Sequence, residues 1–544
     1  MNNKVKLFLL ISFIFLIGFF LRFYQLGGIP NSMDWDEVSW GYNAYSVLLT
    51  GRDEYGSFLP LSFKAFGDYK QPVYIYSEIL PIKVFGLSSL AVRFPSAVYG
   101  ALSIILIYPL ILELFYHNKK KTMLALVGTG IFAVSPWSIQ FSRVAFESTL
   151  GVFFVFAGLY LFLLGVRKNS TLAFFISAFS FALSAYAYHS EKFFMPFLIL
   201  LLLIFFRKFF IKRKMFTFLL LVFIFILNSL WILNSTSTAR GVSVLFTNQQ
   251  TQLLENSANA IIYYNQRDDK LGTILNNRRI VYANTFLLNY LKHWDPNWLF
   301  ITGDLERHHA PGMGLLYLTS LPFIILGLFV MFRDKYENRY LIAGWFLLAP
   351  IASAIAIDAP NAERSLIMLP PFIVWEAIGL VAFCNWCNRS SNKQILKKAG
   401  LYIVIFIYAF NFLYYVQQYF AHTNLDTEKY WQYGYQQAVE YISKPEFKDK
   451  RIIFSSEFEQ PYIFYLFYSK YDPSRYIKSG GSSVVNNNCF SIDKHFFGNC
   501  EKMLQPGDIF ITLKEQPPKA QSKLKTIYYS NQKEAVSIYS ISNH

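Results

Sequence analysis

Charged residues and cysteines are scarce in this sequence of 544 residues. Only 15% of the residues are Asp, Glu, Lys or Arg, against roughly 25% in a typical soluble domain. The four cysteines are too few for the disulfide scaffold of a small secreted domain. A composition of 54% hydrophobic and 19% aromatic residues excludes a soluble protein, because it leaves more apolar surface than a soluble core can bury.

Motifs that bind soluble nucleotides are also missing. The sequence contains no Walker A motif and no dinucleotide fingerprint after a strand. The net charge of +16 does not indicate a nucleic-acid partner, because the basic residues fall in short clusters between apolar runs and form no single stripe. The composition therefore predicts a polytopic α-helical membrane protein that binds no nucleic acid.

About eleven apolar segments approach the roughly 20 residues that a helix needs to span a membrane. Because no small-residue cleavage site follows the first segment, we interpret it as a retained transmembrane helix and not as a signal peptide. The predicted spans lie near 5–24, 91–115, 123–141, 146–166, 172–188, 193–206, 215–233, 312–332, 340–357, 366–387 and 399–420.

Basic residues indicate the orientation of these spans. With the N-terminus in the cytosol, every inner loop is rich in Lys or Arg, as the positive-inside rule requires. The inner loops are 116–122, 167–171, 207–214, 333–339 and 388–398. The sequence thus predicts a multi-pass protein of the inner (cytoplasmic) membrane with two long outer loops, 25–90 and 234–311. The second of these loops is polar, rich in Asn and Gln, and is expected to be irregular.

The tail from residue 421 has a different character. Its segments RIIFSS, DIFITL, TIYYS and AVSIYSI are typical of short strands, and PYIFYLFYSKY is typical of a helix between them. We therefore expect a transmembrane module over 1–420 and a small mixed α/β domain over 421–544, outside the cytosol. Cys489 and Cys500 would be able to pair in that compartment.

The stretch NSMDWDEVSW, residues 31–40, places three carboxylates beside a predicted membrane boundary. Asp34 and Glu37 have the spacing of a capping box, which predicts Asp34 as the N-cap of a helix lying on the membrane surface. Capping does not explain Asp36, and an acid at a membrane face is otherwise costly. We therefore predict a function for Asp36. A similar helix is expected over 71–86, beginning at Pro72.

Carboxylates and basic residues gather on the predicted outer face. Arg and Lys are suited to hold a phosphate, and a carboxylate is suited to take a proton from a hydroxyl. Because no nucleotide motif is present, the expected donor is a sugar carried on a lipid phosphate.

Four motifs occur in order: WDE at 35–37, KQP at 70–72, VRFPSA at 92–97 and SRVAFE at 142–147. Together they resemble the polyprenyl-phosphate-sugar-dependent glycosyltransferases of the GT-C superfamily, namely the group of protein O-mannosyltransferases and aminoarabinose transferases. The resemblance is strongest over residues 1–240. Further blocks that resemble bacterial members are AYAYHSEKFFMPFLILL, GDLERHHAPGMGLLYL and DAPNAERSL.

The resemblance implies roles for individual residues. The acidic pair of the family falls on Asp36 and Glu37, with Asp36 as the general base or as the residue that orients the acceptor. The second acidic position falls on Glu147, where the family usually has Asp. The resemblance implies Lys70 and Arg93 as ligands of the donor phosphate. Arg93 matches the arginine that opens the second span.

Three more residues are candidates for binding the donor. Arg240 and Arg307 would clamp the phosphate or touch lipid head groups, and His308 would lie near the lipid phosphate. The sequence establishes no cofactor. The resemblance leaves a divalent metal ion open, with Asp36 and Glu147 as its ligands.

These observations predict a membrane glycosyltransferase that moves a sugar from a polyprenyl-phosphate donor to an acceptor hydroxyl at the outer face, with inversion as the resemblance implies. The acceptor is a lipid, a glycan or a protein. The alternatives are a flippase or transporter of lipid-linked sugars and a polysaccharide polymerase or ligase. The charges at the outer ends of the spans favour the enzyme, because transporters typically keep coupling charges near the membrane midplane.

Overall fold

The computed structural model describes residues 3–210, 251–388, 394–485, 488–513 and 521–542. The chain divides into two units, which we call the helical unit and the mixed unit. The helical unit comprises Met1–Arg22, Tyr99–Ser142 and Phe146–Tyr415. The mixed unit comprises Phe23–Val98, Arg143–Ala145 and Val416–His544.

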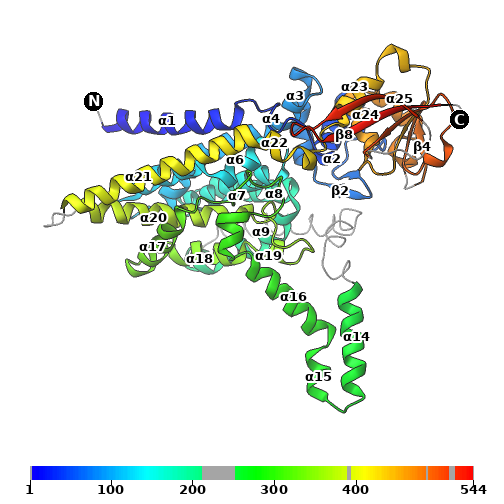
Figure 1. Cartoon of the computed structure of the whole chain (residues 1–544). Helices are drawn as coiled ribbons and strands as arrows, with labels where there is room; N and C mark the ends of the chain where they lie inside the picture. The colour runs from blue at the N-terminus through cyan, green and yellow to red at the C-terminus, as the bar shows by residue number, and fades with distance from the viewer. Residues whose placement is uncertain (1–2, 211–250, 389–393, 486–487, 514–520, 543–544) are drawn as a thin grey trace. The chain divides into compact units, whose positions relative to one another are not determined.

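Apolar helices make up most of the helical unit (Figure 1). Every predicted apolar segment among the described residues contains a helix, and the segment 215–233 lies outside those residues. The helices are α1 (Asn3–Phe23), α4 (Ser89–Leu114, which begins in the mixed unit), α5 (Lys121–Val134), α6 (Pro136–Arg143), α7 (Glu147–Lys168), α8 (Thr171–Ala187), α9 (His189–Phe205), α10 (Arg207–Phe210), α14 (Thr251–Asn265), α15 (Lys270–Leu275), α16 (Arg278–Lys292), α17 (Ser320–Arg333), α18 (Arg339–Leu348), α19 (Ile351–Ala354), α20 (Leu369–Asn388) and α21 (Gln394–Gln417). Short turns of other helix types are η1 (Trp298–Thr302) and η2 (Leu366–Met368).

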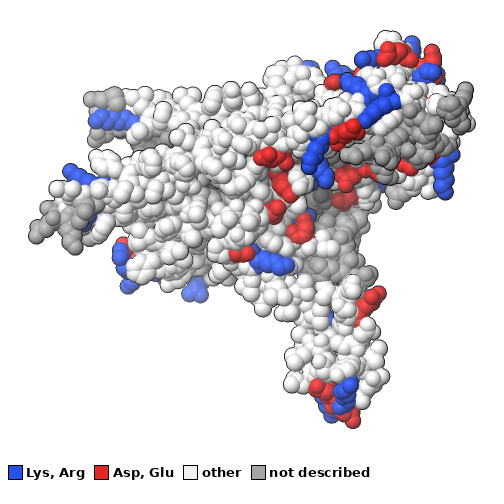
Figure 2. Space-filling model, in the orientation of Figure 1, with Lys and Arg blue, Asp and Glu red and all other residues white. Residues whose placement is uncertain are grey.

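Several of these helices are long and apolar enough to cross a membrane. Among the described residues five helices qualify, and the pair α5 and α6, bent by 52°, makes a sixth if it is counted as one span. Figure 2 shows that the face of the apolar helices is almost free of charged side chains between their ends. Because hydrocarbon does not solvate charge, this surface is that of a multi-pass membrane protein. The count of eleven spans stays a prediction.

Two glycines allow α17 and α20 to lie in close contact (Figure 1). A Cβ atom added to Gly327 of α17 would collide with the backbone carbonyl of Trp375, and one added to Gly379 of α20 would collide with that of Phe323. Small residues at a helix crossing let the two backbones approach closely, and such residues are enriched where membrane helices pack against each other.

The outer loop 234–311 is not irregular over the part that the structure describes, so that prediction was wrong. Residues 251–292 contain α14, α15 and α16. The polar residues that suggested a loop act as helix N-caps: Asp269 accepts a hydrogen bond from the Gly272 amide, and Asn277 accepts one from the Arg279 amide. Side chains of Asn and Asp favour both loops and helix starts, so composition alone did not separate them.

In the mixed unit, the helix predicted after residue 34 is α2 (Trp35–Thr50). Asp34 is its N-cap, as predicted, and its side chain accepts a hydrogen bond from the Glu37 amide at 2.9 Å. The helix ends at Gly51, whose φ of 70° is the left-handed conformation that glycine adopts without strain.

The apolar face of this helix packs against protein. Val38 and Tyr42 are completely buried, and α2 packs against α3 (Pro72–Phe85), α24 (Pro461–Tyr468) and α25 (Pro473–Lys478). Helices from the C-terminal tail thus cover the face that we expected to lie against the membrane, and the position of α2 at the membrane surface stays a prediction. Partners this far away along the chain leave no local signal in the helix itself.

The second predicted helix, α3, begins at Pro72 as expected. Its inner face is buried, whereas Leu80, Val84 and Phe85 are exposed. An exposed apolar strip of this kind is typical of a helix that lies at a membrane interface, so that placement stays a prediction for α3. A short hairpin, β1 (Phe63–Ala65) and β2 (Asp68–Lys70), precedes the helix.

A six-stranded sheet forms the C-terminal part of the mixed unit (Figure 1). Its order is β4-β5-β3-β6-β8-β7, in which β3 runs parallel to β5 and β6 and the remaining pairs are antiparallel. The strands are β3 (Ile452–Phe454), β4 (Phe490–Ile492), β5 (His495–Phe497), β6 (Ile509–Thr512), β7 (Gln521–Tyr528) and β8 (Glu534–Ile541). The remaining helical segments of the unit are η3 (Gln418–His422), α22 (Thr423–Asp426), η4 (Glu428–Trp431), α23 (Tyr435–Ile442), η5 (Pro445–Phe447), η6 (Gly481–Val484) and η7 (Glu501–Met503).

The expected mixed α/β character of the tail is confirmed, because β3, β6, β7 and β8 fall on the four predicted strands and α24 on the predicted helix. The hairpin of β4 and β5 was missed. In the structure the tail forms one unit together with residues 23–98. The domain boundary between residues 420 and 421 stays a prediction.

A disulfide joins Cys489, just before β4, to Cys500, just after β5. Alkylation without reductant is expected to leave both cysteines unmodified, and reduction should expose both to the reagent, as peptide mass spectrometry would show. Because the bond closes a loop of 11 residues, replacing both cysteines with serine should lower the free energy of unfolding by about 3 kcal/mol. Alkylation of both cysteines in the unreduced protein would contradict the pairing.

Candidate active site

Asp36 and Lys70 form an ion pair at the N-terminal end of α2. Antiparallel pairing of β2 with β1 places Lys70 opposite Phe63 at the end of the hairpin. The Lys70 Nζ atom lies 2.5 Å from Asp36 Oδ1 and 5.9 Å from the ring centroid of Trp40. The Lys70 side chain is 5% exposed and that of Asp36 is 26% exposed, so a ligand reaches the carboxylate more easily than the ammonium group.

Glu37, the next residue, has a completely different environment. Its carboxylate forms a two-point ion pair with the Arg93 guanidinium: Nε donates to Oε1 and Nη2 to Oε2, both at 2.9 Å. The Ala145 amide also donates to Oε1 at 2.9 Å. Glu37 and Arg93 are both completely buried. The capping-box spacing predicted a local role for Glu37, whereas the structure joins it to two other segments.

Arg93 also holds the loop that leads into α2. Its Nη1 atom donates to the carbonyl of Pro30 at 2.6 Å, and Nη2 donates to that of Ser32 at 2.5 Å. A planar guanidinium provides several donors in a fixed arrangement, which suits it to bind a carboxylate and carbonyls at once. In this structure, therefore, Arg93 positions the backbone on either side of Asp34.

Three polar side chains of the tail hold the same loop from the other side. They lie four residues apart, in α22, in η4 and directly after η4, and we call Asn424, Glu428 and Gln432 the clasp. The Asn31 amide donates to Asn424 Oδ1 at 2.9 Å, and Asn31 Nδ2 donates to Glu428 Oε1 at 2.7 Å. The Trp35 amide, next to Asp36, donates to Gln432 Oε1 at 2.9 Å.

Buried bonds hold the clasp itself in place. Glu428 is 2% exposed and accepts hydrogen bonds from the amide and the hydroxyl of Ser530, at 2.7 and 2.8 Å. Asn424 Nδ2 donates to the Gly28 carbonyl at 3.0 Å. A polar network with several bonds to the same side chains favours one geometry, because breaking the bonds of the buried Glu428 carboxylate leaves it unsatisfied.

Arg143 binds the beginning of the loop that precedes α2. Its Nη2 atom donates to the carbonyls of Gln25 and Ile29 at 3.4 and 3.3 Å. Its guanidinium carbon lies 5.0 Å from the ring centroid of Tyr419 and 4.8 Å from that of Phe420. The predicted motifs around residues 93 and 143 thus converge on the loop that precedes α2.

The remaining predicted site residues belong to the helical unit. Glu147 is the first residue of α7 and is buried. His308 is buried between the rings of Phe141 and Phe146, and its Nδ1 atom lies 3.1 Å from Asp304 Oδ2. The carbonyl of Arg307 accepts a hydrogen bond from Gln140. The predicted functions of these three residues stay predictions, and Arg240 lies outside the described residues.

The Asp304 carboxyl fixes the orientation of the His308 ring. Burial alone would raise the pKa of Asp304, but the charge and hydrogen bond of His308, with a hydrogen bond from the Ala362 amide, outweigh that effect and lower the pKa below its ordinary value. The ionised Asp304 thereby orients the imidazole ring.

The surroundings of Asp36 do not fit the divalent metal ion that the resemblance left open. A metal ion held by protein side chains alone needs several carboxylate or imidazole ligands. Within the described parts of the chain, no group of three or more His, Cys, Asp or Glu residues is arranged to hold one. The positive charge next to Asp36 is supplied by Lys70. We therefore derive no step through a metal ion.

Glu54, in the loop after α2, is a buried carboxyl that the sequence did not single out. It accepts hydrogen bonds from Asn43 Nδ2 at 2.8 Å and from the Ser482 hydroxyl at 2.5 Å. Burial raises the pKa of Glu54 to about 7, against an ordinary value of 4.5. The protonated form is therefore favoured in the folded protein below about pH 7.

This shift predicts how stability depends on pH. Between about pH 4.5 and 7 the unfolded chain loses the Glu54 proton while the folded protein keeps it, so stability falls as pH rises through this window. The full loss would be roughly 3 kcal/mol. Glu54→Gln, which resembles the protonated form, should flatten the profile, whereas Asp449→Asn, at a 94% exposed carboxylate, should not. Melting temperatures from pH 4.5 to 8 test this, and an unchanged slope in Glu54→Gln would contradict it.

The sequence did not identify the clasp. Its only local signal is the spacing of Asn424, Glu428 and Gln432, which suits one face of a helical segment. The partner of this face is Asn31, which lies 393 residues from Asn424 along the chain. Single-sequence patterns indicate local structure and carry no information about such a contact.

A family model described as dolichyl-phosphate-mannose-protein mannosyltransferase matches residues 70–232. No curated protein sequence matches the chain. Several solved structures resemble its fold. ArnT from Cupriavidus metallidurans in the apo state has a TM-score of 0.56 at 9% identity, and ArnT bound to undecaprenyl phosphate has 0.55 at 10%. In both cases the match covers 99% of this chain and 98% of the other.

An archaeal relative in fold is the oligosaccharyltransferase AglB from Archaeoglobus fulgidus, solved in complex with an inhibitory peptide and a dolichol-phosphate. Its TM-score is 0.53 at 12% identity, and the match covers 94% of this chain and 69% of AglB. At identities this low, the likeness shows the fold.

Proposed function

The chain has the GT-C fold that its motifs predicted, and from this premise we propose that it transfers a sugar from a polyprenyl-phosphate donor to an acceptor hydroxyl. The observation that carries the proposal is the ion pair of Asp36 and Lys70. It provides a proton acceptor and a phosphate ligand 2.5 Å apart, at the start of a helix. The acceptor is a lipid, a glycan or a protein.

Asp36 is the general base in this proposal. The acceptor oxygen forms a bond to the anomeric carbon of the sugar, the bond from that carbon to the phosphate oxygen breaks, and the hydroxyl proton passes to the Asp36 carboxylate. A direct displacement inverts the configuration at the anomeric carbon. Partial exposure of Asp36 supports this role, because the acceptor must reach it.

Lys70 stabilises the phosphate as it leaves. Its ammonium group is almost completely buried, and a charge in such a site acts more strongly than it would in water. It lies within hydrogen-bond distance of Asp36, so one cation orients the base and meets the developing negative charge. Because the phosphate is already a good leaving group, positioning supplies much of the rate.

The other predicted residues have supporting roles in the proposal. Glu37 and Arg93 are positioning residues for the loop and the first turn of α2. Glu147 is the second acidic residue of the site. Arg307, His308 and Arg240, the last of which lies outside the described residues, assist Lys70 in binding the donor phosphate.

We place the mixed unit outside the cytosol, with the helical unit in the cytoplasmic membrane. The basic inner loops support this orientation. The disulfide between Cys489 and Cys500 also supports it, because disulfides persist in oxidising compartments. A polyprenyl-phosphate donor in the outer leaflet would then meet the site directly.

A donor panel tests the proposal. Membranes containing the full chain are incubated with radiolabelled polyprenyl-phosphate sugars of several kinds, and labelled acceptor and released polyprenyl phosphate are both measured. We expect one donor to be used by the wild type and by Asp449→Asn, but not by Asp36→Asn. Movement of intact donor across the membrane without sugar transfer would overturn the proposal in favour of a transporter. Transfer onto another lipid-linked glycan would identify a polymerase or ligase.

A further inference from the structure

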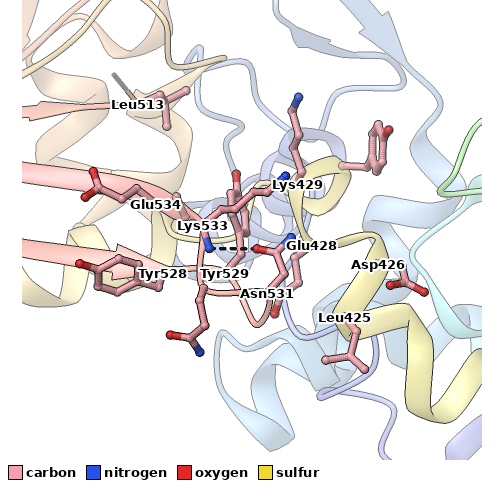
Figure 3. Close-up of a pocket in the computed structure, with 13 residues that line it drawn as sticks. Leu425, Asp426, Glu428, Lys429, Leu513, Tyr528, Tyr529, Asn531, Lys533 and Glu534 are labelled. Atoms are coloured by element: carbon pink, nitrogen blue, oxygen red, sulfur yellow. Dashed lines mark hydrogen bonds between the residues drawn. The ribbon is translucent and has the colours of Figure 1, made fainter. Parts of the chain in front are cut away.

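A polar cavity lies in the mixed unit, in the C-terminal part of the chain. Its volume is about 1000 Å³. Figure 3 shows residues of the β7–β8 hairpin on one side, including Tyr528, Tyr529 and Asn531, and residues of α22 and η4 on the other. We call this cavity the hairpin pocket. None of the predicted site residues lines it.

The hairpin pocket combines aromatic rings with amide side chains. Tyr430 and Tyr528 are 43% and 48% exposed and line the cavity together with Tyr529, Asn531 and Gln532. A tyrosine ring offers an apolar face and a polar edge, and amides both donate and accept hydrogen bonds. A ligand that carries apolar C–H faces and many hydroxyls satisfies both kinds of surface.

The charges of the lining exclude a strongly anionic ligand. Two lysines, Lys429 and Lys533, face three carboxylates, Asp426, Glu428 and Glu534. Glu534 is in addition paired with Lys523 at 2.7 Å. Phosphates and polyanions are selected by an excess of Arg and Lys, and this lining has none.

A peptide strand is also a poor occupant. The open edge next to the pocket is β7, the last strand of the sheet. It carries Lys523 and Lys525, and charged side chains on an edge strand oppose pairing with another strand. Among the described residues, the aliphatic side chains of the lining are Leu425, Leu513 and Ala535. These are few for the side-chain anchors that peptide grooves usually offer.

The walls of the pocket are held in place before a ligand arrives. The Gln532 amide donates to the Tyr529 carbonyl at 2.9 Å, which closes the tip of the hairpin. The Tyr529 ring lies 6.1 Å from that of Tyr433. Ser530 bonds to Glu428, the same carboxylate that holds Asn31 in the loop before Asp36. Preformed walls lower the entropic cost of binding.

We propose that the hairpin pocket binds a neutral glycan chain, and that this glycan is part of the acceptor. The identification of the ligand as an acceptor rests on the proposed function. Binding of the glycan itself does not, because it follows from the lining alone. The shared residue Glu428 connects the pocket to the clasp, so an acceptor held there lies beside the loop that precedes Asp36.

Direct binding tests the proposal without any transfer reaction. The full-length Asp36→Asn protein in detergent is titrated with mannotriose, maltotriose and chitotriose, and binding is followed by saturation-transfer NMR. At least one of these neutral trisaccharides should bind, and Tyr528→Ala and Gln532→Ala, each added to Asp36→Asn, should weaken that binding tenfold or more. Tyr263→Ala is the matched control, because Tyr263 is 49% exposed and lies in α14, outside the pocket.

The outcomes separate the two proposals. Absence of binding by all three trisaccharides, binding that Tyr528→Ala and Gln532→Ala leave intact, or displacement by a Ser/Thr-rich peptide would each overturn the glycan assignment, whether or not the chain transfers sugar. Glycan binding that depends on Tyr528, together with a wild-type chain that uses none of the polyprenyl-phosphate donors, would leave the pocket standing and would refute the proposed function.

Discussion

Asp36→Asn is expected to lower the rate of sugar transfer by about 10²–10⁴-fold, the range that general-base catalysis typically contributes. The amide keeps the size of the carboxylate but no longer accepts the proton of the attacking hydroxyl. It also removes the negative charge 2.5 Å from the Lys70 ammonium, although the amide oxygen still accepts a hydrogen bond from that group. The measurement is the initial rate of label transfer in membranes, at equal amounts of inserted protein.

Two controls make this result specific. Asp449→Asn removes a carboxylate that is 94% exposed and paired with Lys494, and should keep the wild-type rate. Asp36→Asn should remain folded, because its side chain is at the edge of the buried region. If Asp36→Asn transfers sugar at the wild-type rate, the carboxylate is not the base and the proposed mechanism is wrong.

Glu37→Gln is expected to have a different effect from Asp36→Asn: a large loss of stability. The buried Arg93 guanidinium would lose its counter-ion, and leaving one partner of a buried ion pair uncompensated costs about 3–5 kcal/mol. Native proteins have only about 5–15 kcal/mol of stability in total, so much of the protein should fail to fold. Detection of the folded fraction by size-exclusion chromatography at increasing temperature measures the effect.

Arg93→Lys gives a second, independent view of this pair. Lysine keeps the charge but has no planar group with which to bind Glu37 at two points and the carbonyls of Pro30 and Ser32 at once. It should therefore be nearly as unstable as Glu37→Gln. Wild-type melting temperatures in both variants would show that the pair does not hold the loop. Asp36→Asn, one residue away, is the control for the loss of an acidic group and should keep a melting temperature near that of the wild type.

The sequence predicted the parts of the fold that depend on local pattern. The apolar segments became helices, Asp34 became an N-cap, and four strand-like segments of the tail became strands. The motif resemblance also led to Asp36 and Lys70, which the structure places together. Each of these features is decided by residues close together in the chain or by a motif that includes them.

The features that were missed depend on contacts between distant segments. Burial of α2 comes from α24 and α25, and the clasp comes from Asn424, Glu428 and Gln432. The ion pair of Glu37 and Arg93 was also missed, because this contact spans 56 residues and has no sequence signal. The raised pKa of Glu54 arises in the same way, from burial next to Ser482.

The clasp has a consequence for the order of events during biosynthesis. Asn31 leaves the ribosome 393 residues before Asn424, which at about 5–20 residues per second is roughly 20–80 s earlier. During that interval the loop before Asp36 lacks the side chains that hold it. A chain that stops before residue 424 therefore never assembles this loop, so sugar transfer would begin only once synthesis has reached the tail.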